Sequence, residues 1–218
     1  MNDEREAEIG PAAATAFRAL QVGITGGIAC GKSEVGRVAR EMGIAVLDTD
    51  DVAHDVLAPG GEAHEAVVAR FGPAIRRPDG TIDRSALGER VFADAEERAA
   101  LNAIVHPPVR RRWRVWKDDM RAAGRPSMVI IPLLFEVGAG GEWDAVVCVA
   151  APEAVVLDRL RRQGMKEEQA RRRIAAQMDL KEKKQRSDYI IENTGSLADL
   201  REETQNLLNR IFRKETHT

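Results

Sequence analysis

The sequence contains few cysteines and few aromatic residues, and neither sign of charge is in large excess. Its cysteines are Cys30 and Cys148, which do not make a disulfide framework or a metal site with cysteine ligand spacing. Lys and Arg number 33 and Asp and Glu number 35, so the formal net charge is -2. This balance provides no overall attraction to nucleic acid or to an anionic membrane, and a polyanion has to be bound at a local site.

Long apolar runs are also missing. No segment approaches the roughly eighteen apolar residues of a membrane span, and the start "MNDEREAEIG" is acidic rather than basic and then apolar. We therefore expect neither a signal peptide nor a membrane span, and the use of cysteine fits a reducing cytoplasm. Residues 1–19 are polar and alanine-rich without strong periodicity, and we expect a disordered extension outside the fold.

Short, β-branched apolar runs alternate with helical segments along the rest of the chain. The runs cover residues 20–25, 44–48, 128–134, 145–150 and 188–192. A helix is predicted over 32–42, with a stop at Gly43. Alternation of this kind predicts an α/β fold with a mainly parallel sheet flanked by helices on both faces.

An insert of helical character, residues 58–124, separates the second of these runs from the third. Within it, apolar residues recur at helical spacing and share one stripe, namely Val105, Val109, Trp113, Trp116 and Met120. The arginines between them could indicate a surface that binds nucleic acid. The helical spacing of the apolar residues instead favours an ordinary amphipathic core helix. We predict a helical substrate-binding lobe inserted into a core formed by residues 20–57 and 125–218.

A second basic and strongly helical region covers about residues 153–184. Gly164 breaks one helix, and a new one begins near Lys166. Two solvated helices would explain the composition. A mobile lid that brings arginine to a transferred phosphoryl group explains it equally well, and the phosphate motif described next favours the lid.

A phosphate-binding motif lies between the first run and the first helix, where Gly26 is followed after four residues by Gly31, Lys32 and Ser33. This is the pattern and the context of a Walker A loop, or P-loop. Its glycines let backbone N–H groups converge on phosphate oxygens at a helix N-terminus. Lys32 reaches the outer phosphates and Ser33 binds Mg²⁺ in such a loop.

Acidic residues follow the second run in "LDTDDVAHDVL", where Asp48, Asp50 and Asp51 cluster. Ligands of open α/β sheets bind at such strand ends. A carboxylate here can orient or deprotonate an attacking hydroxyl group, or hold Mg²⁺ through water, and Asp51 alternatively caps the next helix. The guanine-reading and switch motifs of a regulatory GTPase are absent from their expected places, which favours a small kinase.

Six motifs in one order make the sequence resemble the dephospho-CoA kinase family from about residue 20 to the final helix. They are "GITGGIACGKS", "DTD" with "VAH", "NAIVHP", "IPLLFE", "RRRIAAQ" and "IIENTGS". The resemblance implies a P-loop core, a helical lobe that binds the acceptor, and a lid. It also implies transfer of the γ-phosphoryl group of ATP, with Mg²⁺, to the ribose 3′-hydroxyl of dephospho-CoA. No nucleic-acid or membrane partner is expected, and the sequence does not predict an oligomeric state.

The resemblance assigns roles residue by residue. Asp50 accepts or orients the proton of the attacking hydroxyl group, while Asp48 and Ser33 support Mg²⁺. Arg162 is the expected lid arginine. The triphosphate and adenine are expected at Gly27, Ala29, Cys30, Gly31, Lys32, Ser33, Glu34, Asn193 and Gly195, and the acceptor at Asp50, His54, His106, Leu134 and Glu136.

For some of these residues a structural role is equally open. His106 precedes a proline and could end a helix, and Leu134 could be a simple wall residue of the site. The segment "NTGS" could form a turn followed by a helix cap at Ser196. The loop departs from the family at Ala29, Cys30 and Glu34, where family members often carry glycine, a small or polar residue, and threonine. There are two alternatives. The protein could be another small-molecule kinase with the same architecture, or a nucleotide-binding module that no longer transfers a phosphoryl group.

Overall fold

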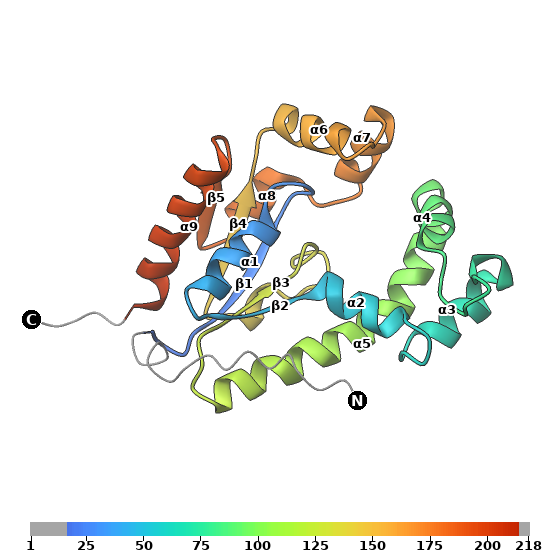
Figure 1. The fold of residues 1–218 in the computed structure, drawn as a ribbon, viewed down its shortest axis with the longest axis horizontal. Coiled ribbons are helices and arrows are strands. Elements are labelled where there is room, and N and C mark those ends of the chain that lie inside the picture. The colour runs from blue at the N-terminus through green and yellow to red at the C-terminus, as the bar shows by residue number, and fades with distance from the viewer. Residues whose placement is uncertain (1–16, 214–218) are drawn as a thin grey trace, which may run out of the picture.

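The computed structural model describes residues 17–213, and at its centre is a five-stranded sheet of order β2-β3-β1-β4-β5. All four neighbouring pairs are parallel. The strands are β1 (Gln21–Gly26), β2 (Ala45–Asp48), β3 (Ser127–Ile130), β4 (Ala145–Ala150) and β5 (Tyr189–Glu192). Figure 1 shows the sheet between its helices, and the predicted α/β fold with a parallel sheet is confirmed.

Helices connect these strands. They are α1 (Lys32–Glu41), α2 (Thr49–Leu57), α3 (His64–Phe71), α4 (Arg84–Ala93), α5 (Ala95–Ala122), α6 (Glu153–Arg162), α7 (Glu167–Ala175), α8 (Leu180–Gln185) and α9 (Leu197–Phe212). Two short 3₁₀ helices cover Pro73–Ile75 and Gly140–Glu142. Gly164, with φ +84°, separates α6 from α7 as expected.

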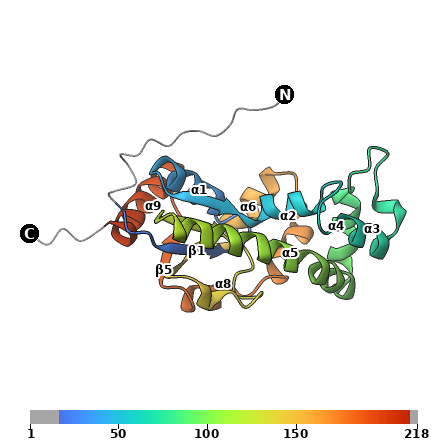
Figure 2. The ribbon, with the colours of Figure 1, turned by 90° about the horizontal axis from the view of Figure 1, so that it is seen from below.

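The two faces of the sheet have different cores, because successive side chains of a strand point to opposite faces. Val22 and Ile24 of β1 pack with α1 and α9 in one cluster of buried residues. Val129 of β3 and Val146 of β4 belong to a second cluster with α2 and α5. Figure 2 shows α1 and α8 on opposite sides of the strands.

The insert between β2 and β3 is helical, and its described part has one isolated β-bridge, between Arg76 and Ile82. Figure 1 places α3 and α4 away from the sheet, while α5 returns to it. Val105, Val109 and Trp113 are buried on one side of α5, as the stripe predicts. The arginines beside this stripe form ion pairs with carboxylates, Arg111 and Arg112 with Glu62 and Arg110 and Arg114 with Glu142.

Several predicted boundaries are wrong. The third strand ends at Ile130 rather than at residue 134. Helix α8 packs against β1 and β4, so residues 180–184, the last part of the expected lid, contact the sheet. Phe17 packs edge-on against Phe212 with ring centroids 6.1 Å apart, so the fold begins within the expected extension.

The remainder of that extension, residues 1–16, lies outside the described residues, as do residues 214–218. Across residues 17–213, none of the helices combines the length and the apolar character needed to traverse a lipid bilayer.

Candidate active site

The P-loop joins β1 to α1, and its glycines occupy backbone positions that a side chain would not tolerate. Gly26 has φ +141°, and a Cβ atom there would lie 2.0 Å from the Val149 carbonyl oxygen. Gly31 has φ +105° and precedes the first residue of α1. Both positions therefore require glycine, and the loop can present its N–H groups at the N-terminus of α1.

Lys32 bends back over this loop. Its Nζ donates to the Gly27 carbonyl at 2.7 Å and to the Gly26 carbonyl at 3.3 Å. Burial lowers the pKa of Lys32, and the carboxylates of Asp48 and Asp50 act in the opposite direction. The lysine thus lies in a desolvated position between the loop and the acidic cluster, where an added anion favours its charged form.

The loop is braced from the far edge of the sheet by the segment after β5. Asn193 is 4% exposed. Its Nδ2 donates to the Cys30 carbonyl at 2.9 Å, and its Oδ1 accepts from Arg159 at 3.0 Å. Arg159 also donates to the Ala29 carbonyl at 3.1 Å. The side chain expected to meet adenine therefore holds the P-loop in shape.

The rest of "NTGS" matches the structural alternative. The hydroxyl of Ser196 accepts the Asp199 N–H at 3.2 Å, and the Asp199 carboxylate accepts the Ser196 N–H at 2.7 Å. This reciprocal pair is a capping box at the start of α9. A Cβ atom on Gly195 would lie 2.5 Å from that carboxylate, so a side chain there would displace Asp199 from the capping box.

Cys30 is completely buried under the loop. Burial raises the pKa of its thiol, although Lys32 and hydrogen bonds with the Ala151 and Gly27 backbone act in the opposite direction. Burial likewise raises the pKa of Cys148, to about 11. A thiol that is neutral and buried is a weak nucleophile, so Cys30 acts as a small apolar residue beneath the phosphate site.

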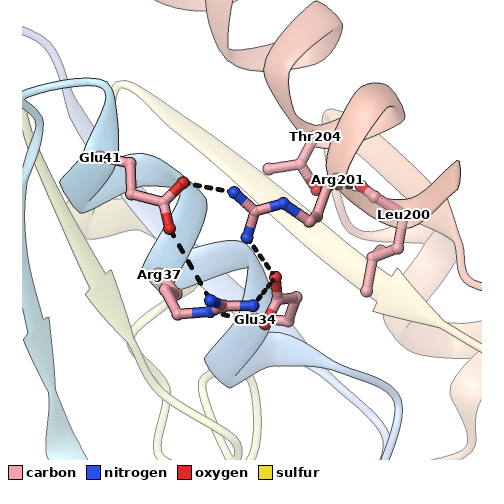
Figure 3. Close-up of polar contacts among 6 residues, drawn as sticks. All are labelled: Glu34, Arg37, Glu41, Leu200, Arg201 and Thr204. Atoms are coloured by element: carbon pink, nitrogen blue, oxygen red, sulfur yellow. Dashed lines mark hydrogen bonds and ion pairs between the residues drawn. The ribbon is translucent and has the colours of Figure 1, made fainter. Parts of the chain in front are cut away.

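Glu34, where the family often has threonine, points away from the loop toward α9 (Figure 3). Its carboxylate accepts from Arg37 at 2.7 and 2.9 Å and from Arg201 at 2.8 Å. Arg201 also binds Glu41. These hydrogen bonds hold the pKa of Glu34 below its usual value, against the opposing effect of burial. The extra negative charge near the phosphate site is therefore neutralised within the protein.

Replacing Arg201 with methionine is expected to raise the KM for ATP by about 2- to 5-fold, because Glu34 is then only partly neutralised beside a polyanion. Adding Glu34→Thr to this variant is expected to restore the KM. Steady-state kinetics at low and high salt would measure both effects, and the defect should shrink at high salt. Arg40→Met, at an exposed position of α1, is the control, and an unrepaired defect in the double variant would contradict the prediction.

The acidic cluster stands where β2 passes into α2. Asp48, and not Asp51, caps this helix, because its Oδ1 accepts the Asp50 N–H at 3.0 Å. Burial raises the pKa of Asp48. Asp50 is an exposed residue, yet desolvation raises the pKa of its carboxyl group, while Lys32 lowers it. A carboxylate with a raised pKa beside the phosphate lysine is suited to proton transfer.

Leu134 and Glu136, which are expected to contact the acceptor, follow the end of β3 and make contacts within the protein. Leu134 is completely buried and belongs to the core, as its structural alternative proposes. Glu136 forms an ion pair with Lys183 at 2.8 Å and accepts the Met178 N–H at 2.9 Å. Lys183 is also completely buried and donates to the Pro132 carbonyl at 2.7 Å. Glu136 thus fastens the segment after α7 to the exit of β3.

The histidines are placed differently from one another. His106 lies within α5 rather than at its end, since the helix continues through Pro107 and Pro108. Burial lowers the pKa of His106. His54 is exposed in the last turn of α2. His54 on α2 and His106 on α5 are both on helices in or next to the lobe that is expected to bind the acceptor. No described contact joins either of them to the P-loop.

Arg162 does not meet the P-loop in this arrangement. Its guanidinium group pairs with Asp158 at 2.7 Å, and its side chain is 77% exposed. Arg159, one turn earlier in α6, contacts the loop instead. The sequence could not distinguish these arginines, because which side of α6 faces the core depends on its packing.

A family model described as dephospho-CoA kinase matches residues 20–199. The chain belongs to the dephospho-CoA kinase family. A dephospho-CoA kinase of Geobacillus kaustophilus is 45% identical over 197 residues, which cover 89% of this chain and 96% of that relative. One of Symbiobacterium thermophilum is 47% identical over 180 residues, which cover 81% of this chain and 74% of that relative.

Solved structures agree with membership of the dephospho-CoA kinase family. A crystal structure from Thermus thermophilus has a TM-score of 0.70 at 36% identity, covering 88% of this chain and 97% of that one. The dephospho-CoA kinase from Campylobacter jejuni has a TM-score of 0.60 at 29% identity, with 88% and 96% covered. A shikimate kinase from Acinetobacter baumannii, with a TM-score of 0.51 at 16% identity, shares the fold.

Proposed function

We propose that this protein transfers the γ-phosphoryl group of ATP to the ribose 3′-hydroxyl of dephospho-CoA, giving coenzyme A and ADP. A bond forms between the hydroxyl oxygen and the γ-phosphorus, and the bond from that phosphorus to the β–γ bridging oxygen breaks. The hydroxyl proton passes to Asp50, and ADP leaves with the bridging oxygen. This is the reaction of a kinase in coenzyme A biosynthesis, and the family membership supports it.

The observation that carries the proposal is that the P-loop, which would bind the phosphates of ATP, lies near the carboxylate that would bind the acceptor hydroxyl group. Lys32, the phosphate lysine, lowers the pKa of Asp50, and Asp50 acts to raise the pKa of Lys32. Asp48 pairs with Ile130 of β3, and Ile130 pairs with Ile24 of β1. Asp50, two residues after Asp48, therefore lies at the same carboxyl-terminal edge of the sheet as the P-loop, where a phosphate and an attacking hydroxyl group would meet. A module that only binds nucleotide does not need this carboxylate.

ATP would be held by the backbone of residues 27–33, with Lys32 on the outer phosphates. Mg²⁺ would be held by Ser33 and Asp48, together with water and phosphate oxygens. One hydroxyl and one carboxylate suit Mg²⁺, which usually keeps several waters and few protein ligands. When bound, Mg²⁺ neutralises charge on the phosphates.

Two groups of helices would have separate roles, one in binding the acceptor and one in forming the lid. The lobe of residues 58–124, with His106 on α5, would bind the acceptor together with His54. Helices α6 and α7 would form the lid, and Arg159 rather than Arg162 would be its arginine at the P-loop. A cytoplasmic location remains a prediction from the sequence.

The proposal is tested with purified protein, ATP, Mg²⁺ and a panel of acceptors. Dephospho-CoA should give coenzyme A and ADP in equal amounts, by chromatography and by a coupled ADP assay. Shikimate and nucleoside monophosphates test the alternative of a different small-molecule kinase. Turnover of one of these without turnover of dephospho-CoA would refute the proposal, and binding of ATP without any transfer would favour a nucleotide-binding module.

The acidic limb of the pH profile should respond to the neighbours of Asp50. Asp50 must be ionised to accept a proton, and burial raises its pKa, so the limb of kcat/KM lies above the pH that an ordinary aspartate gives. Asp51 raises this pKa further and Arg84 lowers it. Asp51→Asn should therefore move the limb to lower pH and Arg84→Met to higher pH. Shifts in the same direction would contradict the assignment.

A further inference from the structure

The motif "RRRIAAQ" ends at Gln177, which has no role in the site described above. Gln177 lies in the short segment between α7 and α8. Its side chain reaches the P-loop, where the Ile28 N–H donates to Oε1 at 3.0 Å. The two residues are 149 positions apart in the chain, so this contact joins the base of the lid directly to the phosphate loop.

The contact with Gln177 is made at the N-terminal end of the P-loop. Lys32 Nζ lies against the carbonyls of Gly26 and Gly27, and the lysine of such a loop reaches the β- and γ-phosphates. The end of the loop at Ile28 therefore adjoins the outer phosphates. Gln177, Gly27 and Ile28 also line one cavity of about 360 Å³, whose other walls come from Cys30, from Ala151 after β4, from α6 and α7, and from the start of α8.

The orientation of the carboxamide follows from its partner. A backbone N–H only donates, so the atom of Gln177 that receives it is the oxygen, and the nitrogen occupies the other position. The side-chain hydrogen bond described for Gln177 uses this oxygen alone. The two N–H groups of the nitrogen are therefore available to an oxygen acceptor beside the loop.

Gln177 is held by the core and not by the lid helices alone. The next residue, Met178, donates its N–H to Glu136 at 2.9 Å. Glu136 is paired with Lys183, which is completely buried and also bonded to Pro132. A side chain fixed in this way at both its backbone and its oxygen is preorganised, which is what electrostatic stabilisation of a transition state requires.

We propose that Gln177 is a further catalytic residue of this kinase. Its Oε1 keeps the Ile28 N–H in place, and its Nε2 donates a hydrogen bond to a peripheral oxygen of the terminal phosphoryl group during transfer. Charge is spread over these oxygens in the transition state, so a fixed donor there favours transfer. The inference rests on the proposed function in taking ATP as the phosphoryl donor.

The test compares Gln177→Ala with Gln177→Glu. Glutamate keeps an oxygen for the Ile28 N–H but cannot donate and adds negative charge. Both variants should lower kcat by about 10- to 100-fold and weaken a non-hydrolysable ATP analogue more than ADP in calorimetry with Mg²⁺. If Gln177 only braces the loop, the loss in Gln177→Glu comes from its added charge alone, and kcat should return to the wild-type value at high salt, where that charge is screened. Gln163→Ala, at an exposed glutamine beside Gly164, is the matched control and should stay within about 2-fold of the wild type.

Wild-type kcat in Gln177→Glu at high salt, or an equal loss of ADP and ATP-analogue affinity in both variants, would overturn the inference. ADP affinity close to that of the wild type shows in the same experiment that the variant is folded. The nucleotide measurements use no acceptor. A wild-type protein that fails to phosphorylate dephospho-CoA would therefore refute the proposed function, while a selective loss of ATP-analogue binding in the variants would still support the site at Gln177.

Discussion

Replacing Asp50 with alanine is expected to lower kcat by about 10²- to 10⁴-fold while ATP affinity changes by no more than a few-fold. The carboxylate is the proposed acceptor of the hydroxyl proton, and losses of positioned acid or base groups are of this size. Asp50 acts on Lys32 through its charge, but the P-loop itself is unchanged by the substitution, so nucleotide binding should survive. Steady-state kinetics with dephospho-CoA, together with calorimetry using ATP, separates the two effects.

The fold should not suffer in this variant. Burial raises the pKa of Asp50, so the folded protein disfavours the ionised carboxylate, and removing it at neutral pH should leave the Tm unchanged or raised. Asp55→Ala, at an exposed residue of the same helix, is the matched control. Unchanged kcat in Asp50→Ala would show that another group accepts the proton.

The sheet could be predicted from the sequence because its signals are local. The run at 145–150 is β4 with the predicted bounds, and the glycines of the P-loop stand at the predicted turn between strand and helix. Strand β3 ends earlier than its apolar run, because residues 131–134 turn away from the sheet and bury Leu134 in the core. Apolar character predicts burial there, but not which element supplies it.

Helix α5 shows where local rules fail. Pro107 and Pro108 each lack an N–H, so a helix end near His106 is the ordinary expectation. The helix nevertheless covers Ala95–Ala122. The buried stripe that includes Val105 and Trp113 continues on both sides of the prolines, and tertiary packing of an amphipathic face outweighs local preference.

The contacts that shape the candidate site were not predictable from spacing. Asn193 binds the Cys30 carbonyl across 163 positions of the chain, and Lys183, in the charged stretch "LKEKKQ", is completely buried. Nothing in that stretch distinguishes Lys183 from its exposed neighbour Lys181. Such pairings depend on how distant elements pack, which one sequence does not record.

Replacing Lys32 with alanine is expected to lower kcat/KM by about 10³-fold or more, with both a higher KM for ATP and a lower kcat. Its ammonium group contacts the Gly26 and Gly27 carbonyls, at the end of the loop where the outer phosphates are proposed to bind. A charge there contributes to binding of the ground state and of the transition state alike. The combined effect separates Lys32 from Asp50, whose loss should affect kcat alone.

Kinetics over a wide range of ATP concentration, with direct binding of ATP and ADP, would measure both components. Burial disfavours the charged form of Lys32 and lowers its pKa, but Lys32→Ala also removes the hydrogen bonds to the Gly26 and Gly27 carbonyls. The Tm of the variant is therefore measured as well, so that a loss of activity is not attributed to unfolding. Lys181→Ala, at an exposed position of α8, should behave as the wild type. If Lys32→Ala kept its ATP affinity and lost only kcat, the lysine would act in the transition state alone and would not bind the ground-state phosphates.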